Sequence, residues 1–412
     1  MRTFFGNFFR ILLVAVSISE WGVLWWLLQR PLATLPLAGH VLGVLVIWAV
    51  NRALAARTQR MQRSRSPVGG LPRLYYAVAF TCLFCFSFLV VTGALWVTVK
   101  VCLGAIAVEA STMPGGGMLA NGVDTGFRWL ANAGVGGIVV AFAYGYTFGQ
   151  RRIRITRLPL PLRHAPASLQ GLQIAQISDL HIGQNLDREQ LAGFVTRVNA
   201  LQPDLICITG DIADGPGSDL ATFFPVLARL HATYGVIAIL GNHDHYAHVD
   251  RVEEQLRALT PFIVLRDAWT TIRTAGGPLH VVGLDDRGPD WARGVTEAPY
   301  LNGALGTIPI GEPILLLSHR PDVFPQAAAG GVSLTLSGHT HGGQIGLPWF
   351  GGRTRNLAEF ITPFDRGLYE RHGSYLYVNC GLGVTAQRMR LCTPREITLI
   401  EVAPGALTQR AA

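Results

Sequence analysis

The sequence predicts four N-terminal transmembrane helices followed by an α/β domain of layered strands and helices. Three observations support this prediction. The first 150 residues contain four apolar stretches near the length of about 20 residues that a helix needs to cross a bilayer. From about Pro166, short apolar runs alternate with amphipathic segments, as in layered α/β folds. Five of these runs end in polar residues, and ligands gather at such strand ends.

Composition shows that the two parts of the chain differ. Half of the 412 residues are apolar and 15% are charged, whereas about a quarter is usual in soluble proteins. Residues 1–164 hold 16 of the 34 lysines and arginines but only three acids, a balance of +13. The remainder has 18 basic and 23 acidic residues, a balance of −5. A nucleic-acid-binding domain would itself be basic, so nucleic acid is not an expected partner of the C-terminal part.

The predicted transmembrane helices lie at 11–28, 33–50, 76–97 and 129–148. The first is not a signal peptide, because no small-residue cleavage site follows it and three further stretches come after it. Six arginines lie between the second and third spans and four follow the fourth, whereas the other two connections hold only Arg30, Lys100 and Arg128. By the positive-inside rule both termini and the α/β domain are cytoplasmic, in a multi-pass protein of the plasma (inner) membrane.

Two ionisable residues lie inside predicted spans. Glu20 and His40 are candidates for function because charges are costly in a bilayer. The simpler expectation is that they pair with each other or lie near an interface. The predicted domains are therefore a membrane domain at 1–150, a basic juxtamembrane linker at 151–168, the α/β domain at 169–404 and a tail at 405–412.

The α/β domain begins with three strands and two helices in alternation. Strands are predicted at 172–181, 204–211 and 235–244, and helices at 186–201 and 218–232. Further apolar strand-like runs begin at residues 279, 313 and 332.

The polar strand ends have the composition of a site for two metal ions. In an extended segment residues i and i+2 point to the same side, so the residues of "DLH" and "HTH" can converge in pairs. Imidazole combined with carboxylate suits Mn, Fe or Zn. Seven ligands are too many for one tetrahedral ion but fit two ions that share a carboxylate, and the adjacent glycines permit close approach of the backbone. The seven candidates are Asp179, His181, Asp211, Asn242, His319, His339 and His341.

These blocks resemble a known family. DLH at 179, GD at 210, GNHD at 241, SH at 318 and GHTH at 338 are similar, in order and spacing, to the five motifs of the calcineurin-like metallophosphoesterases. The resemblance covers about residues 170–402. The segments "RGLYERHGSYLYVNCGLG" and "PREITLIEV" most resemble the YkuE/YaeI-type enzymes and the transmembrane proteins with a metallophosphoesterase domain. Cys380, where a polar or basic residue is expected, and Arg320, where asparagine is usual, depart from the pattern.

The resemblance implies a fold of two packed β-sheets flanked by helices and a role for each motif residue. Asp211 would bridge the two metals, and His243 would act as general acid or stabilise the transition state, oriented by Asp244. Arg320 is a candidate phosphate contact, since a guanidinium suits phosphate. Asp214 either lines the cleft or caps a turn, and we expect the turn. The first metal would be held by Asp179, His181 and His341, and the second by Asn242, His319 and His339.

The predicted function is hydrolysis of a phosphodiester or pyrophosphate bond by hydroxide formed at the two metals. Because membrane tethering raises the local concentration of membrane-bound substrate, we expect a lipid-linked one, in its most specific form a lipid A precursor of the UDP-diacylglucosamine type. Two alternatives stay open: a phosphodiesterase acting on soluble nucleotides, and a membrane sensor or transporter with a regulatory phosphoesterase domain.

Overall fold

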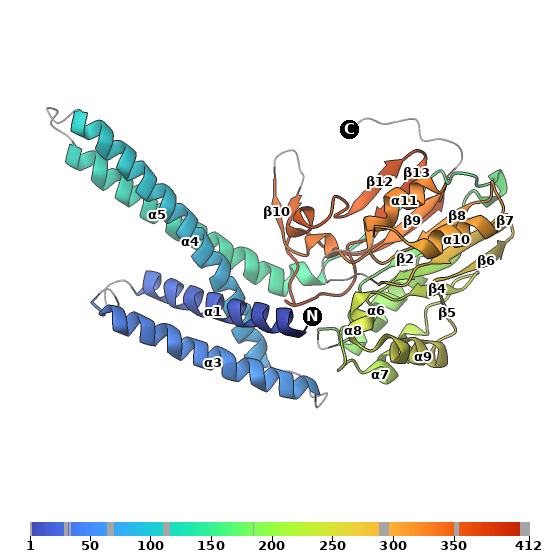
Figure 1. Cartoon of the computed structure of the whole chain (residues 1–412), viewed down its shortest axis with the longest axis horizontal. Coiled ribbons are helices and arrows are strands. Elements are labelled where there is room, and N and C mark those ends of the chain that lie inside the picture. Colours follow the sequence, from blue (N-terminus) through green and yellow to red (C-terminus); the bar gives the residue numbers. More distant parts are fainter. Residues whose placement is uncertain are drawn as a thin grey trace. The chain divides into compact units, whose positions relative to one another are not determined.

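A computed structural model describes residues 2–28, 32, 34–63, 70–109, 116–183, 185–287, 296–349 and 354–403. The chain divides into two compact units, Met1–Tyr144 and Gly145–Ala412 (Figure 1). The expected tail, 405–412, lies outside the described residues.

The first unit consists of long apolar helices. They are α1 (Arg2–Leu27), α3 (Leu37–Arg63), α4 (Gly70–Glu109) and α5 (Gly116–Thr147). Each contributes to a segment long and apolar enough to cross a membrane, at Arg10–Leu27, Leu37–Thr58, Gly70–Cys102 and Gly122–Arg151. The four predicted spans are therefore confirmed as apolar helices, although α5 begins well before the expected residue 129.

The polar residues of these helices do not pair as expected. The Glu20 carboxylate accepts a hydrogen bond from Asn51 Nδ2 at 2.7 Å, and Tyr75 donates to Asn51 Oδ1 at 2.9 Å. His40 instead accepts a hydrogen bond from the Trp21 indole at 3.3 Å. Glu20 and His40 thus do not pair with each other, because neutral donors on neighbouring helices satisfy each of them separately. The alternative, that they lie near a membrane interface, stays a prediction.

The second unit contains two six-stranded sheets. The predicted pair of main sheets is therefore confirmed. The first has the order β1 (Ile153–Leu160), β14 (Arg395–Val402), β2 (Gln173–Ile177), β3 (Leu205–Thr209), β4 (Val236–Ile239) and β5 (Ile263–Val264). The second has the order β12 (Gly367–Arg371), β13 (Ser374–Val378), β9 (Leu334–Ser337), β8 (Ile314–Leu317), β7 (Gly277–Gly283) and β6 (Ala268–Thr274). A two-stranded sheet pairs β10 (Gly346–Pro348) with β11 (Thr354–Asn356).

Helices cover the outer faces of the two sheets (Figure 1). The helices are α6 (Arg188–Asn199), α7 (Leu220–Leu227), α8 (Asn242–Tyr246), α9 (Val249–Leu259), α10 (Pro299–Thr307) and α11 (Phe324–Ala329). Strand β2 is almost wholly apolar because both of its faces are buried. Ile174 packs in the core between the sheets, while Ala175 and Ile177 pack beneath the helices. Full burial of each such aliphatic side chain contributes about 1.5–3 kcal/mol.

The segment expected to be a juxtamembrane linker, 151–168, contains a strand of the first sheet. Its strand β1 pairs in parallel with β14 along its whole length, from Ile153 opposite Arg395 to Leu160 opposite Val402. The linker assignment is corrected because Leu160 is fully buried in the core between the sheets, with Leu158 packed against it.

Candidate metal centre

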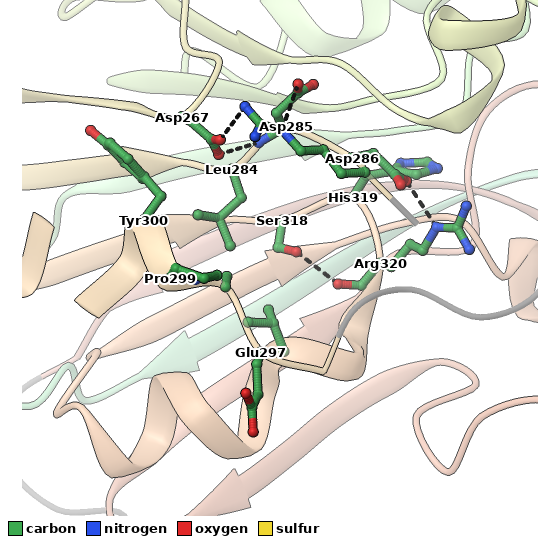
Figure 2. A pocket seen from close by; sticks show the side chains of 13 residues that line it. Asp267, Leu284, Asp285, Asp286, Glu297, Pro299, Tyr300, Ser318, His319 and Arg320 are labelled. Atoms are coloured by element: carbon green, nitrogen blue, oxygen red, sulfur yellow. Dashed lines mark hydrogen bonds and ion pairs between the residues drawn. The ribbon is translucent and has the colours of Figure 1, made fainter. Parts of the chain in front are cut away.

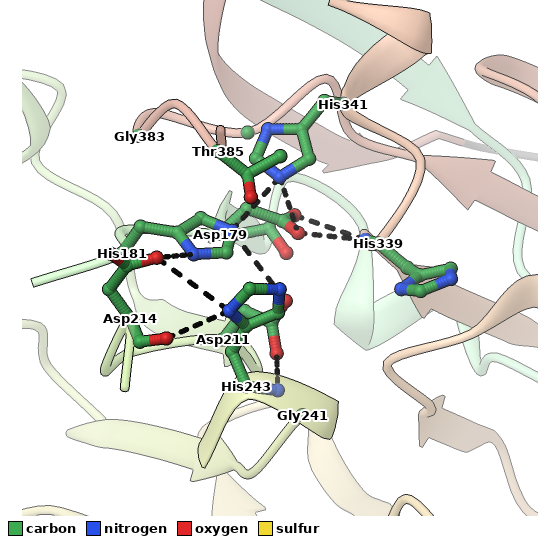
Figure 3. A network of polar contacts seen from close by, with 12 residues as sticks. Asp179, His181, Asp211, Asp214, Gly241, His243, His339, His341, Gly383 and Thr385 are labelled. Carbon is green, nitrogen blue, oxygen red and sulfur yellow. Dashed lines mark hydrogen bonds and ion pairs between the residues drawn. The ribbon is translucent and has the colours of Figure 1, made fainter. Parts of the chain in front are cut away.

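The predicted ligands follow the carboxyl ends of parallel strands. Asp179 and His181 follow β2, Asp211 follows β3, and Asn242 begins α8 just after β4. His319 follows β8, and His339 and His341 follow β9 in the second sheet. Both sheets therefore deliver side chains to one place, as the polar strand ends predict (Figure 3).

Among the described residues these side chains form three overlapping groups, one of which joins Asp211 to His181 and His243. Potential ligand atoms of Asp179, His181 and His341 lie within 4.8 Å of one another, as do those of Asp211, His319 and His339. Asp211 Oδ2 lies 3.6 Å from His181 Nε2 on one side and 3.2 Å from His319 Nε2 on the other. Asp211 is therefore the carboxylate that two ions would share.

Burial sets the protonation states that metal binding needs. Burial, together with the neighbouring His319, lowers the pKa of His339 to about 3. Burial and His181 likewise lower the pKa of His341. Both rings are therefore neutral at pH 7 and offer a lone pair. Burial alone would lower the pKa of His319, but the Asp211 carboxylate raises it to about 10. A metal ion bound at His319 would therefore have to displace a proton.

Asn242 provides the test of whether a metal fits. Its Oδ1 atom is buried and has no hydrogen-bond partner among the residues that the structure describes. A buried acceptor without a partner calls for an unseen ion or water. Together with neutral imidazoles and carboxylates, an amide oxygen suits a divalent cation such as Mn, Fe or Zn. The residues therefore fit two divalent ions, which confirms the expected cofactor without identifying the metal.

The backbone at the ligands differs from the expected extended form. Five candidate ligands have left-handed φ angles of 48° to 68°. The expectation that residues i and i+2 converge along an extended segment is therefore wrong, although the side chains do converge. Non-glycine residues rarely adopt this region, and such strain is concentrated at functional sites. The five are Asp179, His181, Asp211, His339 and His341.

Glycine is required where two ligand loops meet. A Cβ atom on Gly338 would overlap Ser178 Oγ and the Asp179 carboxylate. One on Gly241 would overlap the Asp211 carboxylate. The glycines therefore permit close approach of backbone to ligands, as expected.

His243 lies beside the ligands but is not oriented by Asp244. Its Nδ1 atom is 2.9 Å from the backbone oxygen of Asp214 and 3.6 Å from that residue's carboxylate. Because the carbonyl oxygen can only accept, Nδ1 carries the hydrogen and Nε2 is left for a substrate. The ring packs edge-on against His181, with centroids 4.5 Å apart.

Asp244 instead holds the backbone. Its buried carboxylate accepts hydrogen bonds from the N–H groups of Ile212, Ala213 and Gly241 at 2.7–3.2 Å. As the third residue of α8, Asp244 turns back to cap the helix start, which directs it away from the His243 ring. The prediction that Asp244 orients His243 is corrected to this anchoring role.

Asp214 lies beside the candidate ligands rather than serving only in a turn. Its carboxylate also lies 3.2 Å from His181 Nδ1, so it contacts both His181 and His243. A carboxylate on the far nitrogen of a candidate metal ligand fixes the ring's tautomer. The available signal was its position three residues after the candidate ligand Asp211.

Arg320 lies in the wall of a neighbouring pocket and is almost fully buried (Figure 2). Its Nε donates to Asp286 Oδ2 at 2.9 Å. Its Nη1 and Nη2 atoms are buried and have no hydrogen-bond partner in the described part of the chain. Cys380, the other departure from the family pattern, is buried, and its backbone N–H donates to Glu396.

Arg390 is a residue that the sequence reasoning missed. It is 1% exposed, and its Nη2 donates to the carbonyl oxygens of Cys380, Gly381 and Gly383 at 2.8–3.0 Å. The same nitrogen lies 3.3 Å from His341 Nδ1. Arg390 thus joins the turn at 380–383 to one of the candidate ligands.

The chain is similar in sequence to known metallophosphoesterases. The family model described as calcineurin-like phosphoesterase matches residues 172–343. The metallophosphoesterase YkuE of Bacillus subtilis is 32% identical over 274 residues, which cover 64% of this chain and 91% of YkuE. A transmembrane protein with metallophosphoesterase domain from Danio rerio is 31% identical, over 63% of this chain and 60% of that protein. The solved structure of a dimetal phosphatase from Danio rerio matches with a TM-score of 0.34 and 13% identity, over 52% of this chain and 88% of that one.

The sequence match extends over nearly the whole of YkuE. In addition, this chain brings the candidate metal ligands together at the ends of its parallel strands. The chain therefore belongs to the calcineurin-like metallophosphoesterases, a family of metal-dependent phosphoesterase hydrolases.

Proposed function

We propose that this protein is a membrane-bound phosphoesterase that hydrolyses a phosphodiester or pyrophosphate bond in a lipid-linked substrate at the cytoplasmic face. The observation that carries the proposal is the convergence of the candidate ligands into two groups, Asp179, His181 and His341 on one side and Asp211, His319 and His339 on the other, with Asp211 3.6 Å from His181. Neither group is complete without the residues of both sheets.

Each group would hold one divalent cation. Asp179, His181 and His341 would hold the first, Asn242, His319 and His339 the second, and Asp211 both. When bound, such a pair supplies Lewis-acid charge to the phosphate oxygens and lowers the pKa of the attacking water.

His243 is placed to protonate the leaving oxygen. Asp214 holds Nδ1–H through its backbone oxygen, which presents Nε2 on the other side of the ring. In its imidazolium form the ring would donate the Nε2 proton to the leaving oxygen, and the carboxylate of Asp214 lies 3.6 Å from Nδ1. Asp244 supports the reaction indirectly, because it fixes the backbone that carries His243.

Arg320 is the proposed contact to the substrate phosphate. Its two unpartnered nitrogens form a planar pair of donors, which matches two oxygens of a phosphate. Asp286 holds the opposite edge of the guanidinium and so fixes its orientation.

The apolar helices support a substrate in the membrane. An enzyme tethered to the bilayer meets membrane-bound substrate at a raised local concentration. Arginines adjoining the second, third and fourth spans favour a cytoplasmic catalytic domain. A lipid-linked pyrophosphate such as a UDP-diacylglucosamine-type precursor of lipid A meets both conditions.

The decisive experiment is an assay of the purified full-length protein with Mn(II). We expect hydrolysis of bis-aryl phosphates and of lipid-linked pyrophosphates, lost in Asp211→Asn. Absence of hydrolysis with every substrate, including mono-aryl phosphates, refutes the enzyme proposal. Reporter fusions after residues 65 and 120 test the topology, and an extracytoplasmic signal at 65 contradicts the proposed orientation.

A further inference from the structure

A pocket beside the candidate metal centre has the size of a small-molecule subsite. Its volume is about 410 Å³, within the range of ligand-binding cavities. It opens where the chain leaves β7 and β8, and the start of α10 closes one side. His319, a candidate metal ligand, lines it together with Arg320. The pocket is therefore next to the place where a scissile phosphate would lie.

Most polar groups of this pocket already have partners. Asp285 bonds to His245 at 2.9 Å and to Arg266 at 3.0 Å. Asp267 pairs with Arg287 at 2.8 Å.

The Glu297 carboxylate also lines the pocket and can accept hydrogen bonds. Near His319, by contrast, the described groups left without a partner are the donors of Arg320. Asp286 is engaged by Arg320 Nε, whereas Arg320 Nη1 and Nη2 have no partner among the described residues. The end of the pocket near His319 therefore accepts an oxygen-rich, anionic group.

The opposite end of the pocket is apolar. Figure 2 shows Tyr300 on the side away from Arg320 and His319, with Leu284 and Pro299 between them. Val323 also lines this wall. A half-buried tyrosine ring with aliphatic neighbours suits an aromatic or other ring-shaped organic group.

We propose that this pocket binds an organic substituent attached beyond the scissile phosphate, with Arg320 on the phosphate oxygens and Tyr300 against the substituent. The substrate class is then a phosphate, or pyrophosphate, that carries organic groups on both sides of the bond to be cleaved. A simple monoester would leave the pocket unused. This inference rests on the proposed function, because it assigns the substrate class of the same site.

The test compares three chromogenic substrates with purified full-length protein and Mn(II): bis(p-nitrophenyl) phosphate, methyl p-nitrophenyl phosphate and p-nitrophenyl phosphate. We expect the highest kcat/KM for the bis-aryl diester. Tyr300→Ala should lower the ratio of kcat/KM for the bis-aryl over the methyl diester by about tenfold. Tyr300→Phe is the matched control, since it keeps the ring and should keep the ratio.

A second measurement needs no variant. Diphenyl phosphate should inhibit the wild-type protein at a concentration about tenfold lower than phenyl phosphate does, because it fills both the phosphate position and the pocket. If the protein hydrolyses the esters but Tyr300→Ala leaves the ratio unchanged, or if phenyl phosphate inhibits as well as diphenyl phosphate, the pocket assignment is refuted while the proposed function stands. If no ester is hydrolysed by the wild-type protein, the proposed function fails first.

Discussion

Arg390→Met should weaken one metal position and leave the other intact. Among the described residues, Arg390 is the only hydrogen-bond donor to the carbonyl oxygens of Cys380 and Gly383. Methionine keeps most of the volume but cannot donate. Each buried acceptor that loses its partner costs about 1–3 kcal/mol, and relief of the buried charge offsets part of this. We therefore expect a net loss of about 2 kcal/mol in the free energy of unfolding.

The effect on metal binding follows from the position of the turn at 380–383. Gly383 N–H donates to the backbone oxygen of Asp179 at 2.6 Å, and Leu382 N–H donates to that of Ser178 at 2.9 Å. The turn thus supports the left-handed backbone of Asp179. Loss of groups that orient ligands typically lowers metal affinity by about 10–100-fold. We expect this loss at the position of Asp179, His181 and His341 alone.

The assay is isothermal titration of the metal-free full-length protein with Mn(II), with thermal denaturation alongside. Arg388→Met is the matched control, because Arg388 is on the same segment but is partly exposed and bonds to Gln190. Equal weakening of both metal positions, or an equal effect of Arg388→Met, would refute the reasoning. Unchanged affinity at both positions would also do so.

Three further changes test other parts of the site. His243→Ala should lower kcat by about 10²–10⁴-fold, whereas Mn(II) binding measured by titration should persist. Gly338→Ala should abolish metal binding, because the added methyl group overlaps a candidate ligand carboxylate. Burial alone would raise the pKa of Asp285, but hydrogen bonds from His245 and Arg266 lower it to about 2. That carboxylate therefore stabilises the fold above pH 4, and its contribution is lost as the pH falls towards 2. Asp285→Asn should cost about 2 kcal/mol at pH 7, and the gap in Tm from the wild type should close below pH 3.

The strands and the ligands were predictable from the sequence for a common reason. Buried parallel strands are short apolar runs, and the residues that follow them meet at one edge of the sheet. Asp179, Asp211 and His319 each come within two residues of the end of such a run. Strand β1 was not predictable in this way, because its partner β14 is some 240 residues away along the chain and local pattern does not specify so distant a pairing.

The carboxylates of Asp214 and Asp244 show a second limit of prediction from the sequence. Asp214 and Asp244 both lie within a few residues of predicted ligands, and spacing cannot tell which one faces the ring. The outcome depends on where α8 begins. Because Asn242 is its first residue, Asp244 falls at the third position and caps the helix, while Asp214 remains free to reach His181 and His243.

Asp244 and Arg390 have the same structural role, although their side chains carry opposite charges: each holds backbone groups near a candidate ligand. Asp244 collects three backbone N–H groups around Asp211, and Arg390 collects three carbonyl groups of the turn that supports Asp179. Both side chains are buried in the second unit. Left-handed residues persist only where surrounding contacts determine the backbone, and these two anchors supply such contacts from protein groups alone. The ligand loops should therefore keep their conformation when the metals are removed, and the enzyme should regain activity when Mn(II) is added back to the chelated protein.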